Sequence, residues 1–267
     1  MRPGAGGTVV PVTAESPQRP SGAPEPVPVK PAATVMLIRD AEAGATGVEV
    51  FMMRRTLGAA FGSGMYVFPG GRVEQSDGED VDHAHRVAAI RECFEEAGVL
   101  LALDRDGKHV TDGHPALDAR QGVYDGTVDL VLLCEEHGLE PAVDELAFVS
   151  HWITPAGEGP RRFDTRFYVA PAPPEQASTH DDNETIDSLW ISPSDALDRQ
   201  AEGELVMMPP TVVNLRFLAG FVNVDEAMTE SARMPPPPCI LPRIRRSESG
   251  QIVGVALPGD SDYDDLD

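Results

Sequence analysis

The sequence predicts a protein of the α/β class, for two reasons. First, apolar runs of strand length recur along the chain. Second, amphipathic segments of helical length lie between and after these runs. The expected strands cover residues 33–39, 48–54, 146–153, 161–170 and 186–191, and the expected helices include residues 117–124, 128–137 and 224–233.

The chain is expected to have three parts. Residues 1–30 are rich in Pro, Gly, Ser and Ala and are predicted to be a disordered tail. Residues 31–233 form the main domain, with a helical insertion at about residues 112–140 that either caps a pocket or makes a homodimer contact. Residues 234–267 are expected to form a proline linker, a short hairpin and an acidic tail.

The composition is strongly acidic. The 267 residues carry a formal net charge of −23, which argues against nucleic acid and anionic membranes as partners. A phosphate substrate would need metal ions and a local arginine cluster to bind against this charge. The three cysteines form no CxxC pair, so neither a disulfide framework nor a zinc site is expected. With no secretory signal and no apolar run of about 18 residues, these features predict a cytoplasmic protein.

One helical segment carries a cluster of carboxylates. Residues three and four apart share a helix face, so Glu92, Glu95 and Glu96 lie within one narrow arc. Neighbouring carboxylates repel one another, and a hard divalent cation such as Mg²⁺ or Mn²⁺ removes this conflict. A solvated acidic helix face is the alternative. The preceding residues 69–71, predicted as a tight turn whose backbone approaches a ligand, favour the metal site.

These residues resemble the Nudix box, whose pattern is G-x5-E-x7-R-E-U-x-E-E-x-G-U with U an aliphatic residue. The matching residues are Gly71, Arg91, Glu92, Glu95, Glu96, Gly98 and Val99. From Gly71 to Arg91 the chain advances 20 positions, against 14 in the pattern. The middle Glu of the pattern therefore has no assigned counterpart, and Asp77, Glu79 and His83 are the candidates.

The resemblance implies an α/β/α sandwich around a mixed sheet, with a helical insertion and a C-terminal helical extension. It implies a hydrolase of phosphoric anhydride bonds that cleaves a nucleoside diphosphate linked to another group, with Mg²⁺ or Mn²⁺ as cofactor. Glu92 and Glu96 are the expected principal metal ligands. Glu95 is a further ligand or a supporting group, and Gly71 offers its carbonyl.

The resemblance also suggests catalytic groups beyond the metal ligands. Arg91 is expected to orient Glu95 through an i,i+4 pair. The base that deprotonates the attacking water is either Glu92 itself or Glu184, since many Nudix enzymes take a further carboxylate from this later region. A polar loop without a catalytic role is the alternative for Glu184.

A narrower resemblance concerns the substrate. The residues before the box are similar to the R-[SA]-x3-R-x3-G-x3-FPGG segment of coenzyme A diphosphatases, with Arg55, Gly64 and residues 68–71 matching. Thr56 replaces the small residue, and Ala60 replaces the second Arg. The lengthened box is similar to the branch that includes the animal peroxisomal acyl-CoA diphosphatase, although this chain does not end in S-K-L. The implied reaction cleaves CoA or acyl-CoA to 3′,5′-ADP and a 4′-phosphopantetheine product.

Arginines are the expected contacts to the substrate phosphates. Arg55 ends the second strand close to the glycine-rich segment. Period-2 alternation puts Arg162 and Arg166 on one face of a later strand, where they are candidates to bind phosphate in a bidentate way. A solvated strand edge with internal ion pairs is the alternative.

Two other functions stay open on the sequence. The substrate of the same chemistry is alternatively NADH or ADP-ribose. In a different class, the chain is a non-catalytic Nudix module that binds nucleotides or a protein partner. The intact R-E-x-x-E-E sequence at residues 91–96 argues against the binding module.

Overall fold

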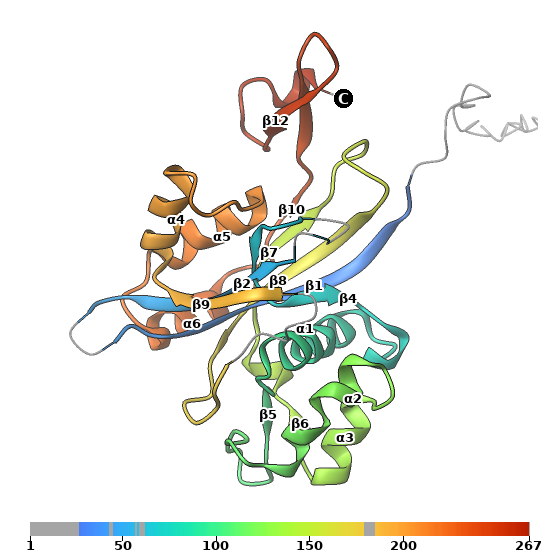
Figure 1. Cartoon of the computed structure of the whole chain (residues 1–267), viewed down its shortest axis with the longest axis vertical. Coiled ribbons are helices and arrows are strands. Elements are labelled where there is room, and N and C mark those ends of the chain that lie inside the picture. The colour runs from blue at the N-terminus through green and yellow to red at the C-terminus, as the bar shows by residue number, and fades with distance from the viewer. Residues whose placement is uncertain (1–26, 43–44, 57, 59–61, 179–184, 267) are drawn as a thin grey trace, which may run out of the picture.

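The computed structural model describes residues 27–42, 45–56, 58, 62–178 and 185–266. Of the tail predicted to be disordered at residues 1–30, residues 1–26 lie outside the described part. The prediction is wrong for Val29 and Lys30, because they belong to strand β1 and pair with strand β8. The body of the molecule is an eight-stranded mixed sheet with helices on both faces (Figure 1). Helices α1, α2 and α3 pack on one face, and α4, α5 and α6 pack on the other. The predicted α/β/α sandwich is confirmed.

The sheet is built around its first strand. Six strands follow the order β10-β7-β8-β1-β2-β3, while β4 pairs with β1 and β9 pairs with β2. The bounds are β1 (Val29–Asp40), β2 (Val48–Arg55), β3 (Tyr66–Val67), β4 (Gly70–Arg72), β7 (Ala147–Ile153), β8 (Arg162–Pro171), β9 (Thr185–Ile191) and β10 (Cys239–Ile240). β1 pairs with β8 in parallel and with β2 and β4 antiparallel, which makes the sheet mixed.

The apolar run in β1 is explained by burial on both sides. Val35 and Leu37 pack into the core under α1, whereas Met36 and Ile38 pack into the core under α4, α5 and α6. All four side chains are fully buried. A strand covered on both faces has no solvated side, so its sequence is apolar throughout rather than alternating.

The helices fill the two outer layers. Their bounds are α1 (Val81–Ala97), α2 (Arg120–Tyr124), α3 (Leu130–His137), α4 (Pro193–Ala201), α5 (Pro209–Leu218) and α6 (Val224–Arg233). Short 3-10 turns are η1 (Gln75–Asp77), η2 (Pro115–Ala119), η3 (Val143–Glu145) and η4 (Tyr263–Asp265). The segment predicted as a helical insertion contains η2, α2 and α3, and it lies below α1 next to the small hairpin of β5 (Ala102–Leu103) and β6 (Glu140–Pro141) (Figure 1).

Helix α1 carries the acidic cluster and has a defined start and end. The Asp80 side chain caps the first turn by accepting the amide of His83 at 2.9 Å. Gly98 ends the helix in the left-handed region, at φ 72°, and its amide donates to the carbonyl of Phe94 at 3.1 Å. These two caps define where the helix begins and ends.

The chain ends in a hairpin of β11 (Arg243–Arg246) and β12 (Ile252–Ala256), which projects from the body beyond β10 (Figure 1). A hairpin was expected in this region. Among the described residues, none of the helices combines the length and the apolar character that crossing a membrane requires.

Candidate active site

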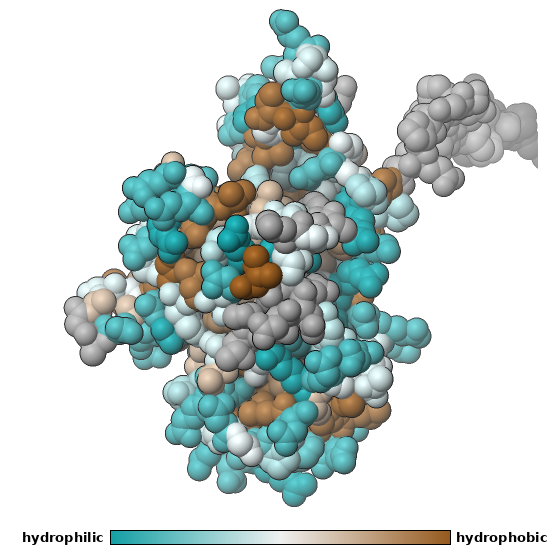
Figure 2. Space-filling model, in the orientation of Figure 1, coloured by the Kyte–Doolittle hydropathy of each residue, from teal (hydrophilic) through white to brown (hydrophobic). Residues whose placement is uncertain are grey.

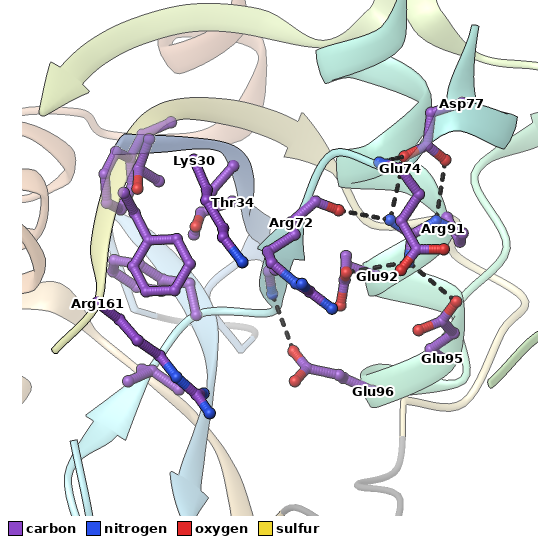
Figure 3. A pocket seen from close by; sticks show the side chains of 18 of the residues that line it. Lys30, Thr34, Arg72, Glu74, Asp77, Arg91, Glu92, Glu95, Glu96 and Arg161 are labelled. Carbon is purple, nitrogen blue, oxygen red and sulfur yellow. Dashed lines mark hydrogen bonds and ion pairs between the residues drawn. The ribbon is translucent and has the colours of Figure 1, made fainter. Parts of the chain in front are cut away.

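The three predicted carboxylates of α1 line one cavity. Glu92, Glu95 and Glu96 face the space beside β4 (Figure 3). Glu96 is buried, and its Oε2 accepts a hydrogen bond of 2.9 Å from the backbone amide of Gly70. The side chains of Glu92 and Glu95 are only 13% and 11% exposed. One helix face therefore brings three poorly solvated acidic groups to a shared surface.

Arg91 joins these carboxylates to one another. Its Nε and Nη2 donate to the two carboxylate oxygens of Asp77 at 2.9 and 3.1 Å. Its Nη1 donates to Oε1 of Glu92 at 2.9 Å and to Oε1 of Glu95 at 3.1 Å, and Nη2 also donates to the carbonyl of Arg72 at 2.7 Å. The expected contact of Arg91 with Glu95 is present, as one part of a larger network.

Of the three candidates for the middle Glu of the Nudix pattern, Asp77 is the one that contacts the box residue Arg91. It is 2% exposed and bonds Arg91, whereas Glu79 and His83 are exposed. Counting forward from Gly71 leads to Asp77, so the extra residues of this box follow Asp77 and precede Arg91. The buried Asp77–Arg91 pair holds the start of the box against the catalytic helix.

The two glycines before the helix are required by close packing. Residues 69–71, predicted as a tight turn, instead form a bend at Pro69 followed by β4. A Cβ on Gly70 would lie 2.5 Å from Thr34 Oγ1, and a Cβ on Gly71 would lie 2.3 Å from Glu92 Oε1. Any side chain at Gly71 would therefore displace Glu92.

The carboxylates form one side of a cavity of about 900 Å³. Besides Arg91, four cationic residues line it, namely Lys30, Arg55, Arg72 and Arg161. Figure 3 shows Lys30, Arg72 and Arg161 reaching into the space that Glu92 and Glu96 face. Among the described residues, the side chains of Lys30, Arg72 and Arg161 have no ion-pair partner. Groups of opposite charge thus line one cavity.

Of the arginines predicted to bind substrate, Arg55 lines the cavity, whereas Arg162 and Arg166 do not. The cavity is lined by the opposite face of β8, which carries Phe163, Thr165 and Phe167. Arg162 Nε donates to the carbonyl of Thr154 at 2.9 Å, and Arg166 pairs with Asp82 at the start of α1. The expected placement of Arg162 and Arg166 at the site is thus corrected.

Tertiary packing determines which face of β8 lines the cavity. The strand face of Arg166 continues into Tyr168 and Ala170, which are buried in the core under α1. The helix therefore covers this face, and the cavity opens on the other. Sequence reasoning missed Lys30, Arg72 and Arg161, and the chain offered one local signal, the Arg161-Arg162 pair at the start of β8. Glu184, the alternative base, lies outside the described residues.

Two models of protein families match the sequence of this chain. The model "NUDT19 Nudix domain" matches residues 79–218, and the model "NUDIX domain" matches residues 28–126. The chain belongs to the Nudix family. The resemblance seen in the box is confirmed, and so is the expected enzyme class, because the family is one of hydrolases of pyrophosphate bonds.

Individual Nudix relatives share between a quarter and about a third of their aligned residues with this chain. The chain is 34% identical over 160 residues to "Acyl-coenzyme A diphosphatase NUDT19" of Gallus gallus, which covers 54% of this chain and 42% of that relative. It is 25% identical over 272 residues to the Xenopus laevis protein of the same name, covering 80% and 71% of the two chains. The crystal structure of a NUDIX hydrolase from Alicyclobacillus acidocaldarius superposes with a TM-score of 0.69 at 28% identity, covering 79% of this chain and 99% of that one. The match to the Gallus gallus relative thus spans less than half of its length.

The donor set of this Nudix box fits a hard divalent cation. Asp77, Glu92, Glu95 and Glu96 bring four carboxylates to one site, where Arg91 supplies a single positive charge. Within the described residues, no three acidic, histidine or cysteine side chains are gathered closely enough to hold a metal ion as they stand. Glu92 and Glu95 each accept a hydrogen bond from Arg91. Each uses one oxygen for this contact, which leaves its second oxygen for a cation.

Burial disfavours ionisation of Glu92 and Glu95. Burial raises the pKa of Glu92 to about 7, Arg91 opposes this rise, and the charge of Glu95 adds to it. Burial likewise raises the pKa of Glu95. A cation bound between these carboxylates would compensate the excess negative charge.

Replacing Glu92 by Gln should stabilise the metal-free protein above pH 7. In the folded chain the raised pKa means that Glu92 binds protons more tightly than in the unfolded chain, so its contribution to stability falls as pH rises from about 4.5 to about 7. The neutral amide avoids this loss. We expect a gain on the order of 2 kcal/mol, or several degrees in Tm, at pH 8 in EDTA, and none near pH 4.

Thermal melts of the wild type, Glu92→Gln and the exposed control Glu202→Gln across this pH range provide the measurement. A pH-independent difference between wild type and Glu92→Gln would show that Glu92 is not a desolvated carboxylate.

Proposed function

We propose that the protein is a metal-dependent pyrophosphohydrolase that cleaves a nucleoside diphosphate linked to another group. The observation that carries this proposal is the charge arrangement of one cavity, which the α1 carboxylates line together with Lys30, Arg72 and Arg161 (Figure 3). A diphosphate has the charge to bind the cations directly and the carboxylates through a metal ion. In a chain with a net charge of −23, such local cations are needed to bind an anion at all.

Each part of the box has a task in this reaction. Glu92 and Glu96 would hold Mg²⁺ or Mn²⁺, with Glu95 as a further or supporting ligand and the Gly71 carbonyl beside them. The metal supplies charge neutralisation at the diphosphate and lowers the pKa of the attacking water. Arg91 fixes one oxygen of Glu92 and one of Glu95, so these ligands are oriented before substrate arrives.

The base that accepts the proton of the water is Glu92 or Glu184. Glu92 faces the cavity and is poorly solvated, as a base acting near neutral pH needs to be. Substitution of each by Gln, followed by pH–rate profiles, separates them: loss of the acidic limb of the profile identifies the base.

The substrate we favour is CoA or an acyl-CoA, cleaved to 3′,5′-ADP and 4′-phosphopantetheine or its acyl derivative. The relatives from Gallus gallus, Xenopus laevis and Homo sapiens are all named acyl-coenzyme A diphosphatase. The cavity of about 900 Å³ is also large enough for a ligand that extends well beyond a diphosphate.

A product-release assay tests this function. Purified protein with Mg²⁺ or Mn²⁺ is incubated in parallel with CoA, acyl-CoA, NADH and ADP-ribose. The proposal predicts metal-dependent release of 3′,5′-ADP from CoA or its thioesters. Turnover of NADH or ADP-ribose alone would keep the chemistry and reject the CoA assignment, and no turnover of any of them would count against the hydrolase.

Arg161 and Arg166 form a matched pair for testing the cation side. Arg161 reaches into the cavity, whereas Arg166 is held on the other face of β8 by Asp82. We expect Arg161→Ala to raise KM about tenfold or more, because a charge-assisted hydrogen bond to phosphate is lost. Arg166→Ala should leave KM within about twofold, because its ion pair with the exposed Asp82 side chain contributes little. The reverse pattern in steady-state kinetics would return the phosphate contact to Arg166.

A further inference from the structure

The C-terminal hairpin contributes to the catalytic cavity although neither family match extends beyond residue 218. Pro242, just before β11, and Val255 of β12 line the same cavity as Glu92. In Figure 1 the hairpin projects at the opposite end of the molecule from α2 and α3. The cavity wall therefore includes a segment that lies outside the Nudix box.

One strand pairing and one hydrogen bond place the hairpin near the turn between β7 and β8. β10 runs parallel to β7, with Ile240 paired to Trp152, so the following Pro242 lies near the end of β7. Arg246 Nη2 donates to the carbonyl of Gly157 at 3.2 Å. Pro155 and Arg161 of this turn also line the cavity. The hairpin and the turn together form a continuous wall.

The chain's acidic end holds the hairpin in shape. Arg245 bonds Asp260 and Asp262 at 2.7 Å each. Arg243 Nη1 donates to the carbonyls of Tyr263 and Leu266 at 2.9 and 2.6 Å. A two-stranded hairpin alone is marginally stable in water, so these contacts give it the order that a binding wall requires.

This wall presents both apolar and charged side chains to the cavity. Pro155, Pro242 and Val255 form its apolar part together with the adjacent Phe163 of β8, and Glu158 and Arg161 of the turn are its charged groups. Phe163 lies beside Lys30 in the β1–β8 ladder, so the apolar part adjoins a cationic residue of the cavity. Figure 2 shows apolar side chains on the outer surface of the hairpin as well, where Val253 is 64% exposed.

From this juxtaposition we infer that the C-terminal hairpin selects the substrate by binding an apolar arm of the non-nucleotide group against Pro242 and Val255. The inference rests on the proposed function, since it concerns how the proposed substrate is oriented in the cavity. The diphosphate lies between the cations and the α1 carboxylates, and the arm extends along Phe163 toward the hairpin. Removing apolar surface from water favours such an arm in proportion to its buried length.

Val255 and Val253 of the same strand provide a matched test. Val255 lines the cavity, whereas Val253 points to solvent. Equilibrium binding of CoA and of a long-chain acyl-CoA is measured by calorimetry on the full chain, with Ca²⁺ in place of Mg²⁺ to limit turnover. We expect Val255→Asp to weaken binding of the acyl-CoA about tenfold or more and binding of CoA less than threefold, because a buried carboxylate opposes an apolar arm. Val253→Asp should change neither.

A second variant covers the case in which Val255→Asp disrupts the hairpin. Val255→Trp keeps an apolar residue of high strand propensity but fills the cavity, so it should weaken binding of the long-chain ester more than that of CoA. Equal effects on both ligands, or equal effects of the Val255 and Val253 variants, would overturn the inference. Binding is measured separately from turnover. A failure of hydrolysis would therefore count against the proposed function, whereas the role of the hairpin is decided by the binding data alone.

Discussion

Replacing Glu96 by Gln should lower kcat by about 10²-fold or more while leaving the thermal midpoint unchanged or raised. Glu96 faces the cavity and is an expected principal metal ligand, so losing its charge removes electrostatic support for the metal and for the reacting diphosphate. The fold should survive, because the carbonyl oxygen of Gln can still accept the amide of Gly70. Steady-state kinetics and thermal melts of one preparation measure both effects.

Asp82→Asn is the control for this substitution. Asp82 lies on the same helix, but its side chain is 80% exposed and pairs with Arg166 outside the cavity. Its removal should leave kcat within about twofold. A Glu96→Gln variant that keeps full turnover would exclude Glu96 from the metal site, and one that melts far earlier would make Glu96 a structural residue instead.

Replacing Arg91 by Met should destabilise the metal-free protein by about 3–5 kcal/mol. Arg91 is 7% exposed and donates five hydrogen bonds, to Asp77, Glu92, Glu95 and the carbonyl of Arg72. Breaking one partner of a buried pair leaves the other charge uncompensated, which costs far more than the pair itself contributes. Urea unfolding in EDTA measures the loss.

A double variant, Arg91→Met with Asp77→Asn, separates the effect of the unpaired buried charge from the effect of lost packing. Asp77 is 2% exposed, so in Arg91→Met its carboxylate stays buried without its cation. Adding Asp77→Asn should recover on the order of 1 kcal/mol or more, whereas Asp77→Asn alone should destabilise the wild type. Strictly additive effects would show that Arg91 and Asp77 do not act as a pair.

Most features of helix α1 could be predicted from the sequence. Helical periodicity alone places Glu92, Glu95 and Glu96 on one face, and a glycine such as Gly98 at the end of a helix favours a left-handed cap. These are local rules, and they hold in the structure. The apolar run of β1 likewise predicts a buried central strand, because it offers no solvated face.

The second side of the cavity depends on long-range packing and was not predictable in the same way. Alternation in β8 correctly separates Arg162 and Arg166 from Phe163, but it does not say which face α1 covers. The approach of Pro242 to the end of β7 depends on a pairing between strands almost ninety residues apart. Sequence patterns therefore located the carboxylates of the cavity and missed most of the cationic residues that line it.

The measurement that tests the metal site most directly is Mn²⁺ binding, followed by electron paramagnetic resonance on the wild type and on Glu96→Gln without substrate. We expect the wild type to bind Mn²⁺ and Glu96→Gln to bind it at least tenfold more weakly, with Asp82→Asn equal to the wild type. Equal Mn²⁺ affinity in all three proteins would contradict the claim that the α1 carboxylates form the metal site.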